Sequence, residues 1–344
     1  MKILYAVQAT GNGHISRAME ILPHLKKYGE VDLFLSGSNS HLQIDAPIKY
    51  RSKGIGLFYN GNGGLQYLDT AKAIQPRRIL NEIKSLPVEK YDLVLNDFES
   101  ITALACMYKK VSSLHFGHQA SFISKNTPRP IKKSMVGELI LKYYARATIQ
   151  VGLHFEPYDT NILPPIIKTE ICQAQPNNLG HITVYLLSYN NKTLLQYLAP
   201  LKDYRFEVFS KEVTHNTQVG NVLFLPVEKD RFNNSLLNCD GIIAGAGFET
   251  PAEALYLHKK LLVIPISGQY EQHCNAAALQ LLGVTVAQQL DDNFTSLFYQ
   301  FITNKQAITL PYTNSTEHII QTMMSKAYQL IDNKIIAEPT PFAL

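Results

Sequence analysis

A glycine-rich turn that leads into a helix is the part of the sequence best suited to bind an anion. Residues 242–244 form a short apolar run, which predicts a buried parallel strand, and a Gly-Ala-Gly turn follows at 245–247. A helix is predicted to begin after this turn, with Thr250 as its N-cap and Pro251 in its first turn. Because a helix start leaves backbone N–H groups and the positive end of the helix dipole free, the turn is expected to bind a phosphate.

A second strand-to-helix loop carries carboxylate and amide side chains. Residues 261–266 predict another strand, and a polar loop over 268–272 separates it from a helix that starts at Asn275. In a parallel sheet such loops lie at the carboxyl edge, where ligands bind. We therefore expect Glu271 and Gln272 to share one binding site with the glycine-rich turn.

Together these two loops resemble the donor-binding signature of the GT-B glycosyltransferases, especially the MurG-like and UDP-glycosyltransferase families. That signature runs from a glycine-rich turn through T-x-x-E-A-L and a strand ending in proline to D/E-Q and N-A. Eleven residues match it in order: Gly245, Gly247, Thr250, Glu253, Ala254, Leu255, Pro265, Glu271, Gln272, Asn275 and Ala276. The resemblance implies an α/β protein of the GT-B class, with two doubly wound Rossmann-like domains that face each other across a cleft.

The resemblance also implies roles for residues of the second domain. Glu253 should accept hydrogen bonds from the ribose hydroxyls of a nucleotide, and Glu271 and Gln272 should contact the donor sugar. The remaining donor-binding candidates are Gly245, Gly247, Phe248, Thr250 and, by position alone, Ser188. The alternatives are a first-turn glutamate favoured by the helix dipole for Glu253, and a simple tight turn for the glycines.

A second glycine turn follows the first predicted strand, residues 3–7. It consists of Gly11, Asn12, Gly13 and His14. The third glycine of a dinucleotide-binding G-x-G-x-x-G is replaced by Ser16, so that fingerprint is unsupported. The turn resembles instead the G-x-G-H loop of GT-B enzymes, whose histidine projects into the cleft between the domains.

His14 is the candidate catalytic base, because an imidazole with an ordinary pKa of about 6.5 can accept a proton at neutral pH. Asp97 follows the strand predicted over 91–96 and is its candidate catalytic partner, which would orient the imidazole and stabilise its charged form. His118 follows the strand predicted over 112–116, and we assign it with Gly11, Asn12 and Gly13 to the acceptor side of the cleft. The alternative for both His14 and Asp97 is that each caps the helix that follows it.

Composition sets the class of protein. The 344 residues suffice for two domains, and 46% hydrophobic with 17% charged residues is ordinary for a globular chain. No apolar run reaches the ~18 residues that span a bilayer. The four cysteines show no C-x-x-C spacing, so neither a zinc site nor a disulfide framework is indicated. We expect a cytoplasmic protein that could associate with a membrane surface.

The charge is divided unevenly along the chain. Residues 1–150 carry 20 Lys and Arg against 11 Asp and Glu, or +9, whereas the remainder carries 12 against 17, or −5. The basic half is expected to attract an anionic partner. Residues 129–146 mix Lys and Arg with apolar side chains, which is typical either of a membrane-surface segment or of an ordinary amphipathic helix with a solvated basic face.

The predicted domain organisation has four parts. Residues 1–155 form an N-terminal acceptor-binding domain, and the proline-containing segment 156–180 links it to a nucleotide-sugar-binding domain over 181–314. Residues 315–344 form a last amphipathic helix and tail, which the resemblance places against the first domain.

The function that the resemblance implies is transfer of a sugar from a nucleotide-sugar donor to an acceptor hydroxyl, with a UDP-sugar as the expected donor. An inverting reaction is expected, with an anionic or lipid-linked acceptor of cell-envelope glycan or glycolipid synthesis and with no nucleic acid partner. The sequence lacks a D-x-D motif, so no metal ligands are assigned and no cofactor is expected. Two alternatives stay open: a nucleotide-sugar 2-epimerase of the same fold, and a non-catalytic nucleotide-sugar-binding protein.

Overall fold

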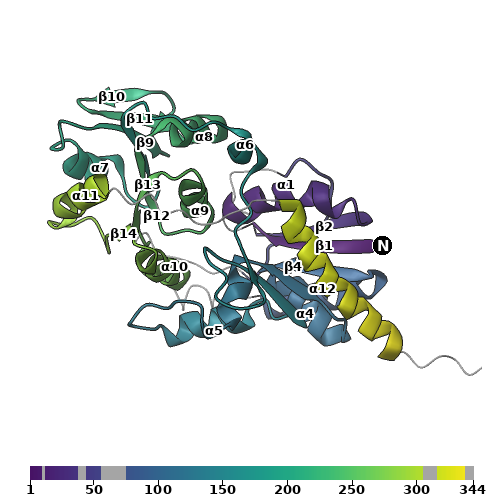
Figure 1. Cartoon of the computed structure of the whole chain (residues 1–344). Helices are drawn as coiled ribbons and strands as arrows, with labels where there is room; N and C mark the ends of the chain where they lie inside the picture. The colour runs from purple at the N-terminus through teal and green to yellow at the C-terminus, as the bar shows by residue number, and fades with distance from the viewer. Residues whose placement is uncertain (10–11, 38–43, 56–74, 305–315, 338–344) are drawn as a thin grey trace, which may run out of the picture.

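Two seven-stranded sheets, each covered by helices, make up the protein (Figure 1). The computed structural model describes residues 1–9, 12–37, 44–55, 75–304 and 316–337, without the side chains of 333–337. The predicted GT-B-type architecture of two parallel-dominated α/β layers is confirmed.

The first sheet is parallel throughout, with the order β3-β2-β1-β4-β5-β6-β7. Its strands are β1 (Lys2–Gln8), β2 (Glu30–Ser36), β3 (Ile48–Ser52), β4 (Leu93–Asp97), β5 (Leu114–Gly117), β6 (Ile149–Leu153) and β7 (Ile162–Leu163). Its helical elements are α1 (Asn12–Leu25), α3 (Pro76–Ser85), η1 (Val88–Lys90), α4 (Ser100–Lys109), η2 (His118–Ile123) and α5 (Met135–Tyr143). Strands β1 and β4 are buried nearly throughout, as their continuous apolar runs require in a sheet covered on both faces.

The second sheet has the order β10-β11-β9-β8-β12-β13-β14 and is parallel except for the antiparallel edge strand β10. Its strands are β8 (His181–Tyr185), β9 (Arg205–Ser210), β10 (Thr217–Val219), β11 (Val222–Pro226), β12 (Gly241–Gly245), β13 (Lys260–Ile264) and β14 (Thr285–Val286). The helices that follow β7 are α6 (Thr169–Gln173), α7 (Asn191–Leu198), α8 (Lys229–Asn238), α9 (Glu249–Tyr256), α10 (Tyr270–Leu281), α11 (Phe294–Thr303) and α12 (Thr316–Ala337).

Both sheets reverse their strand order at a point that faces the other domain. In the first sheet β1 lies between β2 and β4, and in the second β8 lies between β9 and β12. Ligands of open α/β sheets bind at the carboxyl ends of strands beside such a reversal. Helix α1 follows β1 and helix α9 follows β12, so the N-termini of these two helices flank the space where a ligand is expected.

Two helix starts differ from the sequence-based prediction. Helix α9 begins at Glu249 with Phe248 as its N-cap, so Thr250 lies inside the helix and is not its cap. The short glycine turn lets the helix start earlier, and Pro251 still falls in the first turn, where a missing N–H costs nothing. Helix α10 begins at Tyr270, so the residues expected in a polar loop, Glu271 and Gln272, lie in its first turn.

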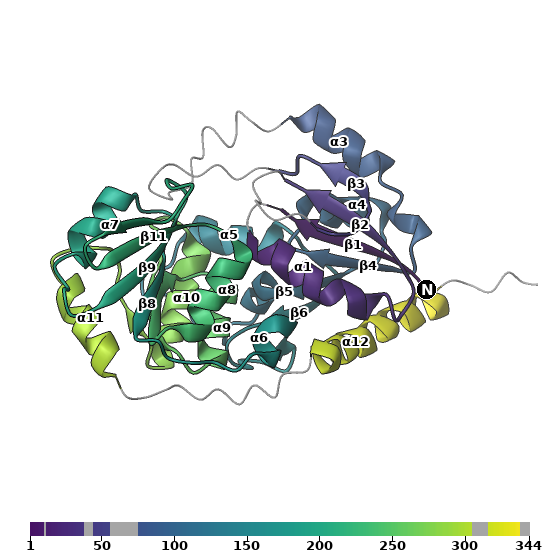
Figure 2. The same cartoon turned by 90° about the horizontal axis from the view of Figure 1, so that it is seen from above.

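The last helix packs on the first domain. Helix α12 lies beside α1 in both views (Figures 1 and 2), and Lys27 and Lys326 bond Glu317 and Asn161 at 2.9 and 2.7 Å. Strand β7, within the segment predicted as the linker, pairs with β6 of the first sheet. The boundaries at 155, 180 and 314 stay predictions. None of the helices in the described part of the chain has the length and apolarity needed to cross a membrane.

Gly152 of β6 supports the segment that carries His118, and its substitution tests this packing. A Cβ at Gly152 would lie 2.5 Å from Cα of Ser121. Because this neighbour is backbone, Gly152→Ala is expected to lower the free energy of unfolding by about 1–3 kcal/mol. Urea denaturation measures it, with Gly247→Ala as control, since a Cβ there meets nothing within 4 Å. Equal stability of the two variants would contradict the close packing.

Candidate functional site

His14 and Asp97 meet at the carboxyl edge of the first sheet. Nδ1 of His14, in the first turn of α1, lies 3.0 Å from Oδ1 of Asp97, the last residue of β4. Phe98 adopts a left-handed φ of 52°, which turns the chain directly after Asp97, and its ring stacks parallel to the imidazole at 6.5 Å. The structure therefore brings the two predicted catalytic residues into contact, as a His–carboxylate pair requires.

Arg17 completes this cluster from one helical turn further along α1. Its Nη2 and Nε lie 2.7 and 3.2 Å from Oδ1 and Oδ2 of Asp97. Burial alone would raise the pKa of Asp97, but the positive charge of Arg17 and the contact with His14 outweigh burial, so the pKa lies well below its ordinary value. Asp97 is therefore an anion that can only accept hydrogen bonds.

The neighbours of His14 bear on its tautomer. Nδ1 faces Oδ1 of Asp97 and also Nη2 of Arg17, each at 3.0 Å, and these two contacts need opposite tautomers because Asp97 only accepts and Arg17 only donates. We assign the proton to Nδ1, since Nη2 of Arg17 already donates to Oδ1 of Asp97 at 2.7 Å, and this tautomer leaves Nε2 with a free lone pair. The side chain of His14 is 14% exposed, whereas that of Asp97 is fully buried, so within this pair the imidazole is the group that a substrate can reach.

Two glycines make room for the cluster. A Cβ at Gly117, which ends β5, would lie 2.7 Å from Oδ1 of Asp97, and one at Gly13 would lie 3.2 Å from Cγ of Glu249. Glu249 belongs to the second domain, and its carboxylate accepts a hydrogen bond from Nη1 of Arg17. The cluster thus joins the candidate base of the first domain to the first residue of α9.

Glu253 lies one turn further along α9 and is buried, with 3% of its surface exposed. Its Oε1 lies 3.1 Å from Nζ of Lys168, in the segment between the domains. Burial raises the pKa of Glu253 to about 7, although the charge of Lys168 opposes this shift. The proposed contact with a ribose would require that a nucleotide share or replace Lys168 as the partner of this carboxylate.

The other predicted donor residues lie around the same edge of the second sheet. Oε1 and Oε2 of Glu271 each lie 3.1 Å from Nε2 of Gln119, across the domain contact. Gln272 accepts from the backbone N–H of Ile266 at 3.0 Å and so braces its own loop. Ser188 is exposed in the turn after β8, next to the strand that carries the glycine turn.

The residues assigned to the acceptor side take different places. His118 is buried, stacks on Phe248 at 4.0 Å, and bonds Leu153 O and Asn275 Oδ1 at 2.9 and 2.8 Å, so it contributes to the contact between domains. The side chain of Asn12 hydrogen-bonds Tyr185 of β8. Gly11 lies outside the described residues.

Sequence reasoning missed four functional candidates: Arg17, Glu249, Lys168 and Gln119. A signal existed for Arg17, because residues three apart on a helix share a face and Arg17 follows His14 at that spacing. The partners of the other three come from distant parts of the chain, so no local pattern indicated them.

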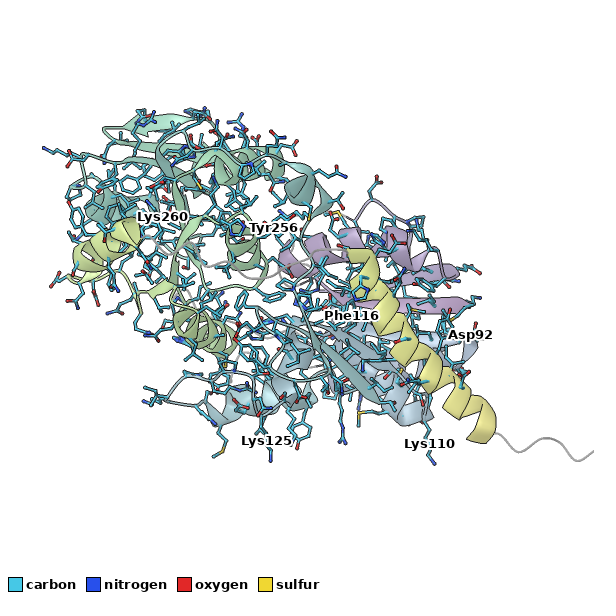
Figure 3. All side chains as sticks on the ribbon, viewed as in Figure 1. Asp92, Lys110, Phe116, Lys125, Tyr256 and Lys260 are labelled. Carbon is cyan, nitrogen blue, oxygen red and sulfur yellow. The ribbon has the colours of Figure 1, made fainter. Side chains whose placement is uncertain are left out.

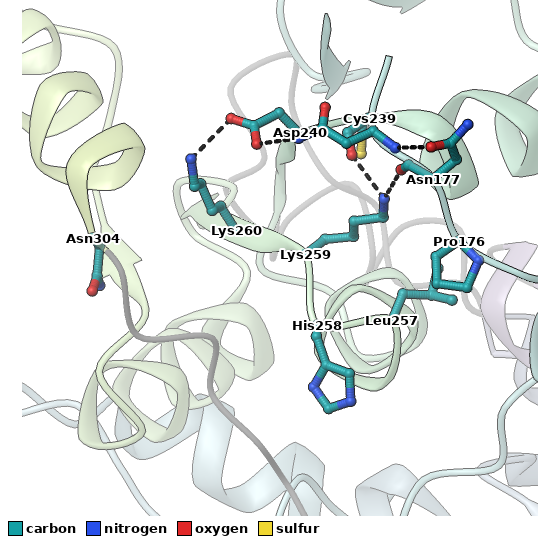
Figure 4. Close-up of a pocket in the computed structure, with 10 residues that line it drawn as sticks. Pro176, Asn177, Cys239, Asp240, Leu257, His258, Lys259, Lys260 and Asn304 are labelled. Carbon is teal, nitrogen blue, oxygen red and sulfur yellow. Dashed lines mark hydrogen bonds and ion pairs between the residues drawn. The ribbon is translucent and has the colours of Figure 1, made fainter. Parts of the chain in front are cut away.

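One hollow in the described structure lies away from this site. It measures about 320 Å³ and is bounded by Asp240 and Lys260, at the amino ends of β12 and β13, opposite the edge where ligands of such sheets bind (Figure 4). Lys259 donates to the carbonyls of Asn177 and Cys239 at 2.6 and 2.7 Å, and Lys260 pairs with Asp240 at 2.9 Å. Because its cations are already paired, we do not assign this hollow to the reaction.

Among the described residues no three His, Cys, Asp or Glu side chains form a metal-binding group.

Two facing Rossmann-like sheets with loops of this kind define the GT-B class of glycosyltransferases. Solved structures share the fold: Acinetobacter baumannii MurG (TM-score 0.58, 15% identity, 94% of this chain and 99% of that one) and Phytolacca americana UGT2 complexed with UDP-2-fluoro-glucose and pterostilbene (0.60, 12%, 97% and 98%). LpCGTa in complex with UDP is similar (0.59, 11%, 95% and 99%).

Residues 1–304 match the family described as glycosyl transferase family 1, and the chain belongs to this family. None of the curated proteins compared with it matches its sequence. The predicted assignment as a GT-B glycosyltransferase is confirmed.

The raised pKa of Glu253 predicts how stability depends on pH. Because the pKa rises from 4.5 when unfolded to about 7 when folded, the native state binds the proton more tightly, so stability is lost as pH rises between these values. A shift of this size corresponds to about 3 kcal/mol. Glu253→Gln should remove this loss, so its melting temperature should rise relative to the wild type between pH 5 and about pH 8.

Thermal unfolding across this pH range measures the effect. Glu30→Gln, at an exposed position, is the control and should follow the wild type at every pH. A constant difference between Glu253→Gln and the wild type would contradict the raised pKa.

Proposed function

We propose that this glycosyltransferase moves a sugar from a UDP-sugar to an acceptor hydroxyl by a single inverting displacement, without a metal ion or other cofactor. The observation that carries the proposal is the contact of the His14–Asp97 pair, through Arg17, with the start of α9. This contact supports the proposal because it joins His14 to the helix whose glycine turn is suited to a diphosphate.

The proposed reaction has one proton transfer and one displacement. Nε2 of His14 takes the proton of the acceptor hydroxyl while the hydroxyl oxygen bonds to the anomeric carbon. The bond from that carbon to the diphosphate oxygen breaks, and UDP leaves with the electron pair. The backbone N–H groups at Gly245 and Gly247 would stabilise the leaving diphosphate, as helix N-termini do for anions.

The charges around His14 favour its role as base. Arg17, Asp97 and Glu249 together carry −1 when both carboxylates are ionised, so a proton on the imidazole makes the cluster neutral. The carboxylate of Asp97, 3.0 Å from Nδ1, is placed to pair with the imidazolium formed during the reaction. Attractive charges in a buried site act strongly because little water screens them.

The choice of UDP rests on the binding residues and on similar folds. Glu253 can accept two ribose hydroxyls, and Glu271 lies at the start of α10, where a sugar could reach it. UGT2 and LpCGTa were solved with UDP-2-fluoro-glucose and UDP, whereas the similar VinC was solved with dTDP.

The face around α5 suggests an acceptor held at a membrane. Ile131, Met135 and Leu139 expose 106, 80 and 51% of their surface. Lys132, Lys133 and Lys142 accompany them in the sequence, and Lys110 and Lys125 point out from the same edge of the first domain (Figure 3). Exposed apolar side chains among cations fit an anionic lipid surface. We propose that this face, Ile131 to Lys142 with Lys125, binds a membrane and receives a lipid-linked acceptor of the cell envelope.

The residue that follows α5 packs toward the candidate base. Tyr144 packs on Phe98 at 5.0 Å between ring centres, and Phe98 stacks on His14. These ring contacts connect the end of α5 to the His14–Asp97 pair.

A donor screen with two variants tests the proposed reaction. A UDP-sugar at 100 times its dissociation constant should stabilise the wild type by ~2.7 kcal/mol in thermal unfolding. His14→Ala should lower turnover of that donor, measured as UDP release, by about 10²–10⁴-fold while the thermal shift is retained. His24→Ala, near the other end of α1, is the matched control and should keep turnover. Epimerised donor formed without any acceptor would support the 2-epimerase instead.

Sedimentation with vesicles tests the membrane face. The wild type should sediment with vesicles that contain phosphatidylglycerol and less with phosphatidylcholine alone, because the surface is basic. Met135→Glu with Leu139→Glu should abolish the binding. Leu281→Glu, at a position 76% exposed in the second domain, should retain it. Equal binding by all variants would contradict the assignment of this face.

A further inference from the structure

Arg17 holds two carboxylates that come from different domains. Its side chain is 2% exposed and lies between Asp97 of β4 and Glu249 of α9. Toward Asp97 it donates from Nη2 and Nε at 2.7 and 3.2 Å, and toward Glu249 it donates from Nη1. All three guanidinium nitrogens are therefore engaged, which a lysine ammonium could not reproduce, because only a planar fork reaches two carboxylates in fixed directions.

The ion pair between Arg17 and Glu249 exists only while the two domains are together. Gly13 lies against Glu249, and Gly117 lies against Asp97 and Arg17, so the cluster is packed on both sides without spare room. If α9 moved away, Arg17 would lose its ion pair with Glu249 and would keep only the one with Asp97. The position of the guanidinium, and with it the position of Asp97 beside His14, is thus sensitive to the closure of the domains.

Glu249 also lies where an anion is expected. It is the first residue of α9, directly after the glycine turn and Phe248. An unpaired carboxylate there would repel a diphosphate, and the ion pair with Arg17 reduces that repulsion. Arg17 therefore acts on both sides of the reaction, since it orients the partner of the base and neutralises a charge beside the leaving group.

We propose that Arg17 is a positioning residue, which aligns Asp97 and His14 only when Glu249 of the second domain closes on it. This inference rests on the proposed function and adds to it the coupling between domain closure and assembly of the base. Arg17 itself need not contact the acceptor or the sugar.

Three single variants test the coupling through UDP release from the donor found by the screen. Arg17→Lys keeps the charge but not the fork, so kcat should fall at least tenfold while KM for the donor changes less than about threefold. Glu249→Gln removes a negative charge from the cluster, so kcat should fall and the acidic limb of the pH–rate profile should move to lower pH. Arg17→Lys should leave that limb in place.

Glu20→Gln is the matched control. Glu20 of α1 accepts hydrogen bonds from the backbone and hydroxyl of Thr169 at 3.0 and 2.8 Å, so it joins the first domain to the segment between the domains without touching Asp97. Its pH–rate profile should match that of the wild type. If the acidic limb moved in Glu20→Gln as it does in Glu249→Gln, the inference would be overturned, because loss of any negative charge at a contact of α1 would then suffice.

The failure of this inference can be told apart from the failure of the proposed function. If the wild type turns over a UDP-sugar and Arg17→Lys and Glu249→Gln keep its kcat within twofold, Arg17 is not a positioning residue although the function stands. If Arg17→Lys does not fold, Glu249→Gln alone tests the inference, through the direction in which the acidic limb of its pH–rate profile moves. If the wild type neither binds nor turns over any nucleotide sugar, both proposals are wrong.

Discussion

The buried charge of Asp97 is the constraint on which the arrangement of this site depends. A carboxylate without exposed surface is costly unless it is paired, and both of its oxygens are held by Arg17 while one also meets His14. To meet this requirement α1 must start directly after β1, so that His14 and Arg17, one turn apart, face the end of β4. Glycine at position 117 follows from the same requirement, since a side chain there would displace Asp97.

The same guanidinium joins the first domain to the second, so the contact between the domains is an ion pair at the site, with aromatic and polar contacts around it. His118 on Phe248 supplies the aromatic part, and Gln119 with Glu271 supplies a polar part. A GT-B enzyme must bring two domains together around its donor. In this chain the residues that join the domains are also those beside the candidate base, so binding and chemistry share one set of contacts.

Much of the fold and part of the site could be predicted from the sequence. Glycine turns after apolar strands indicated the ligand edge, and the spacing of Gly245 to Ala276 indicated the class, because these are local patterns. The sequence predicts Thr250 as the N-cap of α9, because threonine is a suitable N-cap residue, but the helix begins at Glu249. The short turn after β12 allows the helix to begin before Thr250. The pairs Arg17–Glu249 and Lys168–Glu253 join residues far apart in the chain, and their contacts follow from the packing of two sheets, which no local pattern contains.

The segment between the sheets has a consequence for how the molecule unfolds. Ile166, Ile167 and Ile171 are buried in one apolar cluster with residues of both sheets, such as Val7 and Ile242. Glu20 of α1 also accepts hydrogen bonds from the backbone and hydroxyl of Thr169 at 3.0 and 2.8 Å. The two domains are therefore connected by a packed segment and not by a flexible linker. Heat should melt them in a single cooperative transition, and any hinge between them must rotate about this shared apolar seam.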